Sequence, residues 1–372
     1  MIVEVLLAIS LGYAAVEPAT PVEQAELNLG ILTRATRFKL NGYSGPSQTV
    51  NDSNNWQVFL QTPVGPNFID GTRPWSAVML TMPNSGSSRT SIPNFNTAVP
   101  LRYHTAYNDY SAVVWGGKML LNENLSIGIG YQFSFSAAGN AETNLGEKPG
   151  GRMELSTGPE GAWIVGASSR VSPHDFGLTY TQSHASHVKQ IVEANVSVNP
   201  GVVIVQPMTL SATTKWEPES VVFNYHYRLS SSQNFGINIS WENWRPYELP
   251  FLKVETIGSS TGQSSVEMKN IVCPGINWDV RMSKHHFRFD LKASPSPLIE
   301  GAANGQFNLL DTDTQIIAFK YAFDLGTRSA LSFTTQWDRF KERRIENGGE
   351  HTSYFTVGGY AFWLGTSLQL AL

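Results

Sequence analysis

Leu125 to Ser136 reads LSIGIGYQFSFS, and this stretch decides the fold. Apolar side chains take every second position, with serine, glycine or glutamine between them. Because successive side chains of a β-strand point to opposite faces, the pattern predicts a two-faced strand of about twelve residues. The same period recurs to the end of the chain, at 221–229, 235–242, 276–282, 287–292, 317–324 and 362–372.

The lengths of the connections indicate what the strands build. After residue 109, tight links alternate with long stretches rich in glycine, serine and proline, at 137–160, 186–203, 245–268, 294–313 and 342–352. Outer-membrane barrels have short periplasmic turns and long external loops, whereas the Greek-key connections of a soluble β-sandwich give no reason for this order. The sequence therefore predicts an all-β fold, a transmembrane antiparallel β-barrel of about 14 strands. The expected strands cover 37–45, 55–63, 74–82, 109–121, 125–136, 161–171, 175–185, 204–229 (bent near Pro218), 233–244, 270–282, 286–293, 314–325, 329–341 and 353–372.

Composition excludes several classes of protein. The chain has 372 residues, with 26 lysines and arginines against 30 aspartates and glutamates, for a net charge of −4. An aromatic content of 11% excludes a disordered chain. No apolar stretch approaches the length of about 18 residues that a helical membrane span needs, and no basic cluster favours nucleic acid as a partner. The single cysteine, Cys273, excludes an intrachain disulfide and is expected to be a small hydrophobe facing lipid or a loop.

The charges in the alternating segments decide which face meets lipid. A charge on the lipid face at mid-bilayer costs about 2–4 kcal/mol. The isoleucine, phenylalanine, leucine and valine faces should therefore look outward, with tryptophan and tyrosine at strand ends, Trp244 among them, as interfacial girdles. The charged residues should line the lumen and pair between neighbouring strands: Asp279, Arg281, Arg288, Asp290 and Lys292.

Several segments resemble the FadL-type long-chain fatty-acid transporters of Gram-negative outer membranes, whose relatives take up toluene and other hydrocarbons. Residues 239–247 (ISWENWRPY) are similar to the Ser-Trp-x-x-Trp-(Ser)-x-Phe that ends one family strand. Residues 286–323 resemble the family's strand, Asp-x-Ser-Pro-x-Pro loop and next strand, and the last twelve residues, AFWLGTSLQLAL, resemble its closing strand. The resemblance covers most of the chain from about residue 109. It implies a monomeric outer-membrane barrel, without cofactor or metal, that passively moves a fatty acid, hydrocarbon or detergent-like ligand.

In this family a plug, or hatch, precedes the first strand and carries an Asn-Pro-Ala-Gly-(Leu/Met)-Thr-Arg-like signature. Residues 28–34 read NLGILTR, so Asn28, Leu32, Thr33 and Arg34 match it in place. The resemblance thus implies a hatch over 1–36 and a barrel over 37–372. The alternative is that 3–13 and 26–36 are two further barrel strands, because both alternate acceptably.

The N-terminal fifteen residues could be taken for the apolar core of a signal peptide. They lack a basic region and include Glu4. We therefore expect that the sequence begins close to a mature N-terminus, or that upstream residues are missing.

The resemblance also implies that the ligand leaves sideways into the membrane, where the third strand kinks. Here that strand runs into Pro83, and Asn84 and Gly86 match the family's Asn-x-Gly near the kink. Proline cannot donate to a strand ladder, which gives a local break a physical cause. Alternatively, Pro83 simply ends the strand at a loop.

The external loop 137–160 has almost no apolar side chains, although the family uses this loop for capture. The more apolar loop, 245–257, contains Phe251 and Leu252. A carboxylate ligand would need a cation near such a pocket, and Lys253 and Lys269 are the candidates. The alternative is that both are surface lysines that snorkel.

An enzyme is not expected. Ser183-His184-Ala185-Ser186-His187 lacks the G-x-S-x-G elbow and a third orienting group, and His285-His286 lacks further metal-ligand spacing. The rival functions are a porin for polar solutes, an outer-membrane lipid hydrolase that uses Ser183 or Ser186, and a structural or adhesive barrel.

Overall fold

All elements that the structure describes are β-strands, and all of their pairings are antiparallel. The computed structural model describes residues 26–41, 53–63, 73–83, 111–120, 124–135, 139–145, 148–157, 160–199, 202–246, 252–256, 259–260, 267–299, 312–345 and 355–371. Within these ranges, no helix is long and apolar enough to cross a membrane.

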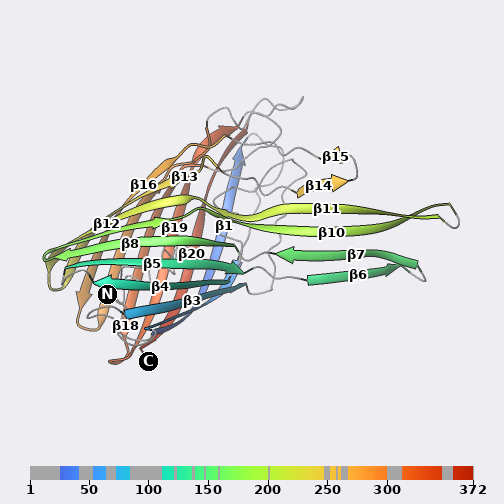
Figure 1. Ribbon diagram of the computed structural model, residues 1–372. Coiled ribbons are helices and arrows are strands. Elements are labelled where there is room, and N and C mark those ends of the chain that lie inside the picture. The colour runs from blue at the N-terminus through green and yellow to red at the C-terminus, as the bar shows by residue number, and fades with distance from the viewer. Residues whose placement is uncertain are drawn as a thin grey trace.

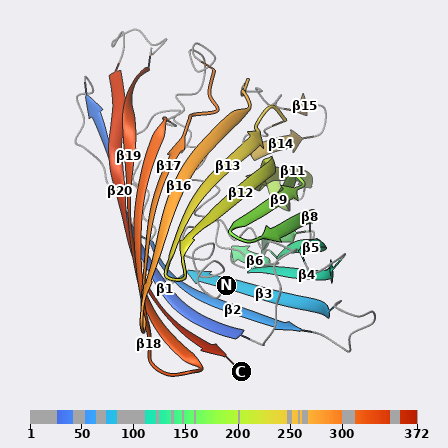
Figure 2. The same cartoon turned by 90° about the vertical axis from the view of Figure 1, so that its left-hand side faces the viewer.

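Most strands form one closed barrel, in which each strand pairs with the strands next to it in sequence or across a projecting hairpin (Figures 1 and 2). The barrel strands, in order around the wall, are β1 (Glu26–Asn41), β2 (Ser53–Pro63), β3 (Arg73–Pro83), β4 (Ser111–Leu120), β5 (Leu125–Phe135), β8 (Glu160–Val171), β9 (His174–Thr181), β12 (Glu219–Ser230), β13 (Gln233–Asn243), β16 (Ile271–Met282), β17 (His285–Ser294), β18 (Thr314–Asp324), β19 (Ser329–Ile345) and β20 (Phe355–Ala371).

A second sheet projects beyond the barrel, away from the end that carries the short turns (Figure 1). Its strands are β6 (Gly139–Leu145), β7 (Lys148–Thr157), β10 (His184–Asn199), β11 (Val202–Glu217), β14 (Leu252–Thr256) and β15 (Ser259–Ser260), in the order β15-β14-β11-β10-β7-β6. The prediction of loops at 137–160 and 186–203 is therefore wrong. Backbone pairing within and between the hairpins supplies the strand ladder there.

The predicted long strand 204–229 is two strands, because Pro218 separates β11 from β12. Proline has no N–H to donate to a ladder, and the break lets β11 join the projecting sheet while β12 stays in the wall. A similar break at 182–183 separates β9 from β10.

The assignment of 26–36 to a hatch is also wrong, since this segment lies in β1. β1 pairs with β2 on one side and with β20 on the other, which closes the barrel. Its alternation explains the placement: Leu29 and Ile31 are exposed on the outer face, whereas Asn28 and Leu32 are buried on the inner face. Residues 1–25, including 3–13, lie outside the described part of the chain.

The two faces of the wall have opposite chemistry, as predicted. On β16 and β17, exposed apolar side chains alternate with less exposed polar ones: Trp278 is 44% exposed and Leu291 is 48% exposed. By contrast, the side chains of Arg288 and Asp290 are 11% and 15% exposed. The exposed apolar face therefore runs around the outside of the barrel, and the ionic residues lie inside.

Candidate ligand-binding lumen

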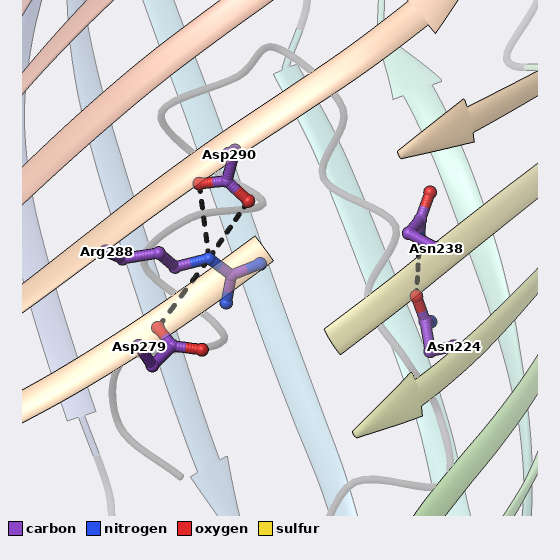
Figure 3. Close-up of polar contacts among 5 residues, drawn as sticks. All are labelled: Asn224, Asn238, Asp279, Arg288 and Asp290. Carbon is purple, nitrogen blue, oxygen red and sulfur yellow. Dashed lines mark hydrogen bonds and ion pairs between the residues drawn. The ribbon is translucent and has the colours of Figure 1, made fainter. Parts of the chain in front are cut away.

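An ion-pair cluster lies on the inner face of β16 and β17 (Figure 3). The register places Asp279 beside Arg288, and Asp290 lies two residues further along β17. Arg288 Nε donates to both carboxylate oxygens of Asp290, at 3.1 and 3.2 Å, and lies 3.8 Å from Asp279 Oδ1. One guanidinium thus holds two carboxylates, and this confirms the predicted pairing of charges between neighbouring strands.

Lys320 lies on the adjacent strand β18, directly opposite Arg288 in the register. It is only 3% exposed, and Nζ has no hydrogen-bond partner within the described residues. The inward-facing neighbours on its own strand, Ala318 and Ala322, are small and buried. Lys320 is therefore flanked by small side chains on its own strand, and its ammonium group has no hydrogen-bond acceptor among the described residues.

A second set of hydrogen-bonded polar side chains lies on the neighbouring strands β19 and β20. Asp338 is 4% exposed and accepts two hydrogen bonds, from Gln336 Nε2 at 2.6 Å and from Trp363 Nε1 at 2.8 Å. These contacts fix the Gln336 amide, because its nitrogen must face the carboxylate. The Gln336 oxygen, Oε1, is buried and has no hydrogen-bond partner in the described part of the chain.

Two asparagines continue the polar lining to the other side of the cluster. Asn224 on β12 and Asn238 on β13 are opposite each other in the register, and the Asn238 amide donates to Asn224 Oδ1 (Figure 3). The lining is thus made of side-chain pairs between neighbouring strands rather than of one compact motif.

Two residues near the end of β13 and the start of β16, Trp244 and Cys273, are not placed as the sequence predicts. Trp244 is 2% exposed and donates from Nε1 to Glu242 Oε2 at 2.9 Å, so it does not belong to an interfacial girdle. Cys273 is fully buried, with Sγ 3.8 Å from Glu242 Oε1 and 3.5 Å from Ser294 Oγ. It does not face lipid, because residue 273 falls on the inward-facing positions of β16.

Two aspartates, each with two basic partners, lie at the end of the barrel with the short turns. Asp324 lies 3.0 Å from His286 Nε2 and 3.8 Å from Arg281 Nη2, and the Arg281 side chain is 63% exposed. Asp175 lies 3.5 Å from Arg170 and 3.6 Å from Arg228. Arg281 therefore belongs to a solvated rim and not to the buried cluster.

The four residues that match the hatch motif all lie on the barrel strand β1. Asn28 and Leu32 are buried on the inner face of β1, Thr33 is exposed, and Arg34 lies opposite Trp363 of β20. The match to the motif therefore does not mark a plug at these positions.

Of the proposed gate residues, Pro83 is the last residue of β3 and pairs with Asn55 of β2. The described β3–β4 ladder ends at Leu80 and Ser111, so residues 81–83 are paired on the β2 side. Asn84 and Gly86 lie outside the described residues.

The residues expected to capture a carboxylate are not gathered in one place. Leu252 and Lys253 lie on β14 of the projecting sheet, opposite Ala212 and Ser211. Lys269 is exposed in the segment before β16, where its backbone N–H donates to Pro297 O at 2.8 Å. Phe251 lies outside the described residues.

Sequence reasoning missed Lys320, Gln336 and Asp338. The available signal was a lysine at an inward-facing position of an alternating strand, between two alanines at 318 and 322. A lysine there must lie on the inner face of the strand, but the sequence does not show that its Nζ makes no hydrogen bond within the described residues.

A closed antiparallel barrel with an apolar outer face and a polar interior is the class of fold to which this chain belongs. More particularly, its fold is that of the FadL-type transporters and hydrocarbon channels. The structure is similar to a Pseudomonas aeruginosa FadL homologue, with 10% identity, 95% of this chain and 92% of that chain covered, and a TM-score of 0.61. It is also similar to the Pseudomonas putida toluene transporter TodX, with 12% identity, 96% and 93% covered, and a TM-score of 0.59.

A third similar structure is the Ralstonia pickettii toluene transporter TbuX, with 11% identity, 96% and 92% covered, and a TM-score of 0.54. No family model matches the chain, and no curated protein matches it. The likeness is therefore one of fold, at a level of identity that leaves few side chains in common.

Proposed function

We propose that this protein passively transports hydrophobic small molecules, long-chain fatty acids or related hydrocarbons, across the Gram-negative outer membrane. Its structural neighbours are transport channels and not enzymes, and they include toluene transporters. The apolar outer face of the barrel suits a lipid environment, and a monomer of about 14 strands has room for a ligand in its lumen.

The observation that carries this proposal is the burial of the inner wall. Lys320, Asp338 and Gln336 are 3%, 4% and 6% exposed, although all three point into the barrel. The inner side chains of an open porin line a water-filled channel and would be solvated. A lumen closed to bulk water favours a bound, partly apolar solute over free diffusion of polar ones.

Residues 1–25 are proposed to form a plug ahead of β1. If they do, deleting 1–25 should convert a closed protein into a conducting one, because β1 and the barrel wall remain intact. Single-channel conductance in planar bilayers measures the change, and a deletion within residues 301–311, which link β17 to β18 in the sequence, serves as control. Unchanged conductance after deletion of 1–25 would count against a plug in this segment.

The route through the membrane is proposed to end laterally, beside Pro83, Asn84 and Gly86, where β3 stops. Capture outside is proposed to use the apolar loop with Phe251 and Leu252, with Lys253 or Lys269 near a charged end of the ligand. Pro83 supports a local opening, since it offers no N–H for a ladder on either side.

Uptake of toluene or oleate by cells that depend on the protein tests the proposed function. We expect uptake to require the full chain and to proceed without an energy source. Expression of the barrel should also leave the permeability to small sugars unchanged in a liposome-swelling assay. Rapid swelling with sugars and no hydrocarbon or fatty-acid uptake would instead identify a general porin.

A further inference from the structure

Two unsatisfied groups of opposite kind lie close together on the inner wall. Among the residues that the structure describes, Lys320 Nζ is a buried donor without a hydrogen-bond acceptor, and Gln336 Oε1 is a buried acceptor without a donor. In the register Lys320 faces Thr334 and Ala318 faces Gln336, so Lys320 and Gln336 are diagonal neighbours on adjacent strands. Such positions are about 7–8 Å apart at the backbone, within reach of two long side chains.

The inward-facing side chain between Lys320 and Gln336 is the short methyl group of Ala318. Ala318 lies opposite Gln336 and two residues from Lys320, so no bulky inward-facing group separates the two. Leaving a buried polar group without a hydrogen-bond partner costs free energy. A donor and an acceptor that lie side by side can both be satisfied by one bound group that accepts one hydrogen bond and donates another. A hydroxyl group of a ligand would satisfy both side chains, because its oxygen accepts a hydrogen bond and its hydrogen donates one.

The charges around the site determine what sort of group fits. Arg288 and Lys320 are balanced by Asp279 and Asp290, and Lys292 and Asp338 add one charge of each sign. A carboxylate would add an unbalanced negative charge to a buried and already neutral set, which is unfavourable. An uncharged group would leave the balance intact.

We propose that Lys320 and Gln336 form the polar end of the ligand site, and that among the hydrophobic molecules that the barrel carries this site prefers an uncharged amphiphile with a hydroxyl group to a plain hydrocarbon or a carboxylate. Lys320 Nζ donates to the hydroxyl oxygen, and the hydroxyl donates to Gln336 Oε1. This inference rests on the proposed transport function and names the class of its ligand.

Equilibrium dialysis of the detergent-solubilised full chain against radiolabelled 1-decanol, decane and decanoate tests the proposal. We expect the wild-type protein to bind 1-decanol about tenfold more tightly than decane, because one buried pair of hydrogen bonds is made or lost. Lys320→Met and Gln336→Leu should each abolish the preference for 1-decanol over decane. Lys284→Met, in an exposed turn, is the matched control and should change nothing.

The heat-modifiable mobility of each variant on an SDS gel reports folding. If Lys320→Met does not fold, Lys320→Arg keeps the donor and should retain the preference for the alcohol. A preference for decanol that survives in both Lys320→Met and Gln336→Leu would overturn the proposal, as would tighter binding of decanoate that depends on Lys320. Binding of decane and decanol with equal affinity would overturn it but leave the transport function standing. If none of the three probes binds, the proposed function fails as well.

Discussion

Replacing Arg288 with methionine should lower the free energy of unfolding of the barrel by about 3–5 kcal/mol, because it leaves two carboxylates in the lumen without their cation. Arg288 holds Asp290 through two hydrogen bonds and Asp279 through an ion pair, and its side chain is only 11% exposed. Methionine has a similar length and keeps much of the packing. The measurement is equilibrium unfolding by urea or guanidinium in lipid vesicles, followed by tryptophan fluorescence.

The matched control for this prediction is Arg281→Met. Arg281 also pairs with an aspartate, Asp324, but its side chain is 63% exposed, so the loss should be at most about 1 kcal/mol. A double variant, Arg288→Met with Asp279→Asn, should recover part of the lost stability, because the remaining Asp290 is then balanced by Lys320 on the adjacent strand. Equal losses for Arg288→Met and Arg281→Met would show that the cluster is solvated and not buried in a closed lumen.

Placing an arginine on the outer face should also be strongly destabilising, provided that the face meets lipid. Leu364 lies in the middle of β20 and is 48% exposed, so in water its replacement would be tolerated. In a bilayer, Leu364→Arg should cost about 2–4 kcal/mol, since the charge lies near the hydrophobic midplane. The fraction of folded protein in phospholipid vesicles, measured over a range of denaturant concentrations, gives the difference.

Leu325→Arg is the control for the outer-face prediction. Leu325 is 52% exposed in the turn between β18 and β19, where a charge should cost about 0–1 kcal/mol because it lies near the interface. A small and equal effect of both substitutions would mean that the outer face meets water. In that case the barrel would not span a membrane, and the transport proposal would fall.

The strand pattern could be predicted from sequence with good accuracy wherever the alternation was clear. The expected strand 125–136 is β5 (Leu125–Phe135), and 314–325 is β18 (Thr314–Asp324). The alternation also separated the charged residues of 288–292 from the apolar ones beside them. These features depend on residues within one strand, and local chemistry is sufficient to determine them.

The candidate site was less predictable. Lys253 and Lys269 were chosen because they flank an apolar loop, yet the first lies on β14 and the second is exposed before β16. Lys320 and Gln336 lie sixteen positions apart in sequence and become neighbours only through the β18–β19 register. Register depends on how two strands pair along their whole length, and one residue of slip would turn both side chains to the outside.

The sequence by itself determined that the chain is built of two-faced strands, that the apolar face of most of them lies outward, and that ionic side chains belong inside. Tertiary structure alone decided that Glu26–Asn41 closes the barrel against β20, that β11 leaves the wall at Pro218, and that Lys320 is buried without a hydrogen-bond partner among the described residues. The physical reason is that the direction of a side chain follows from its own strand. Closure, strand exchange between sheets and the pairing of charges depend on contacts between segments that are far apart in the chain.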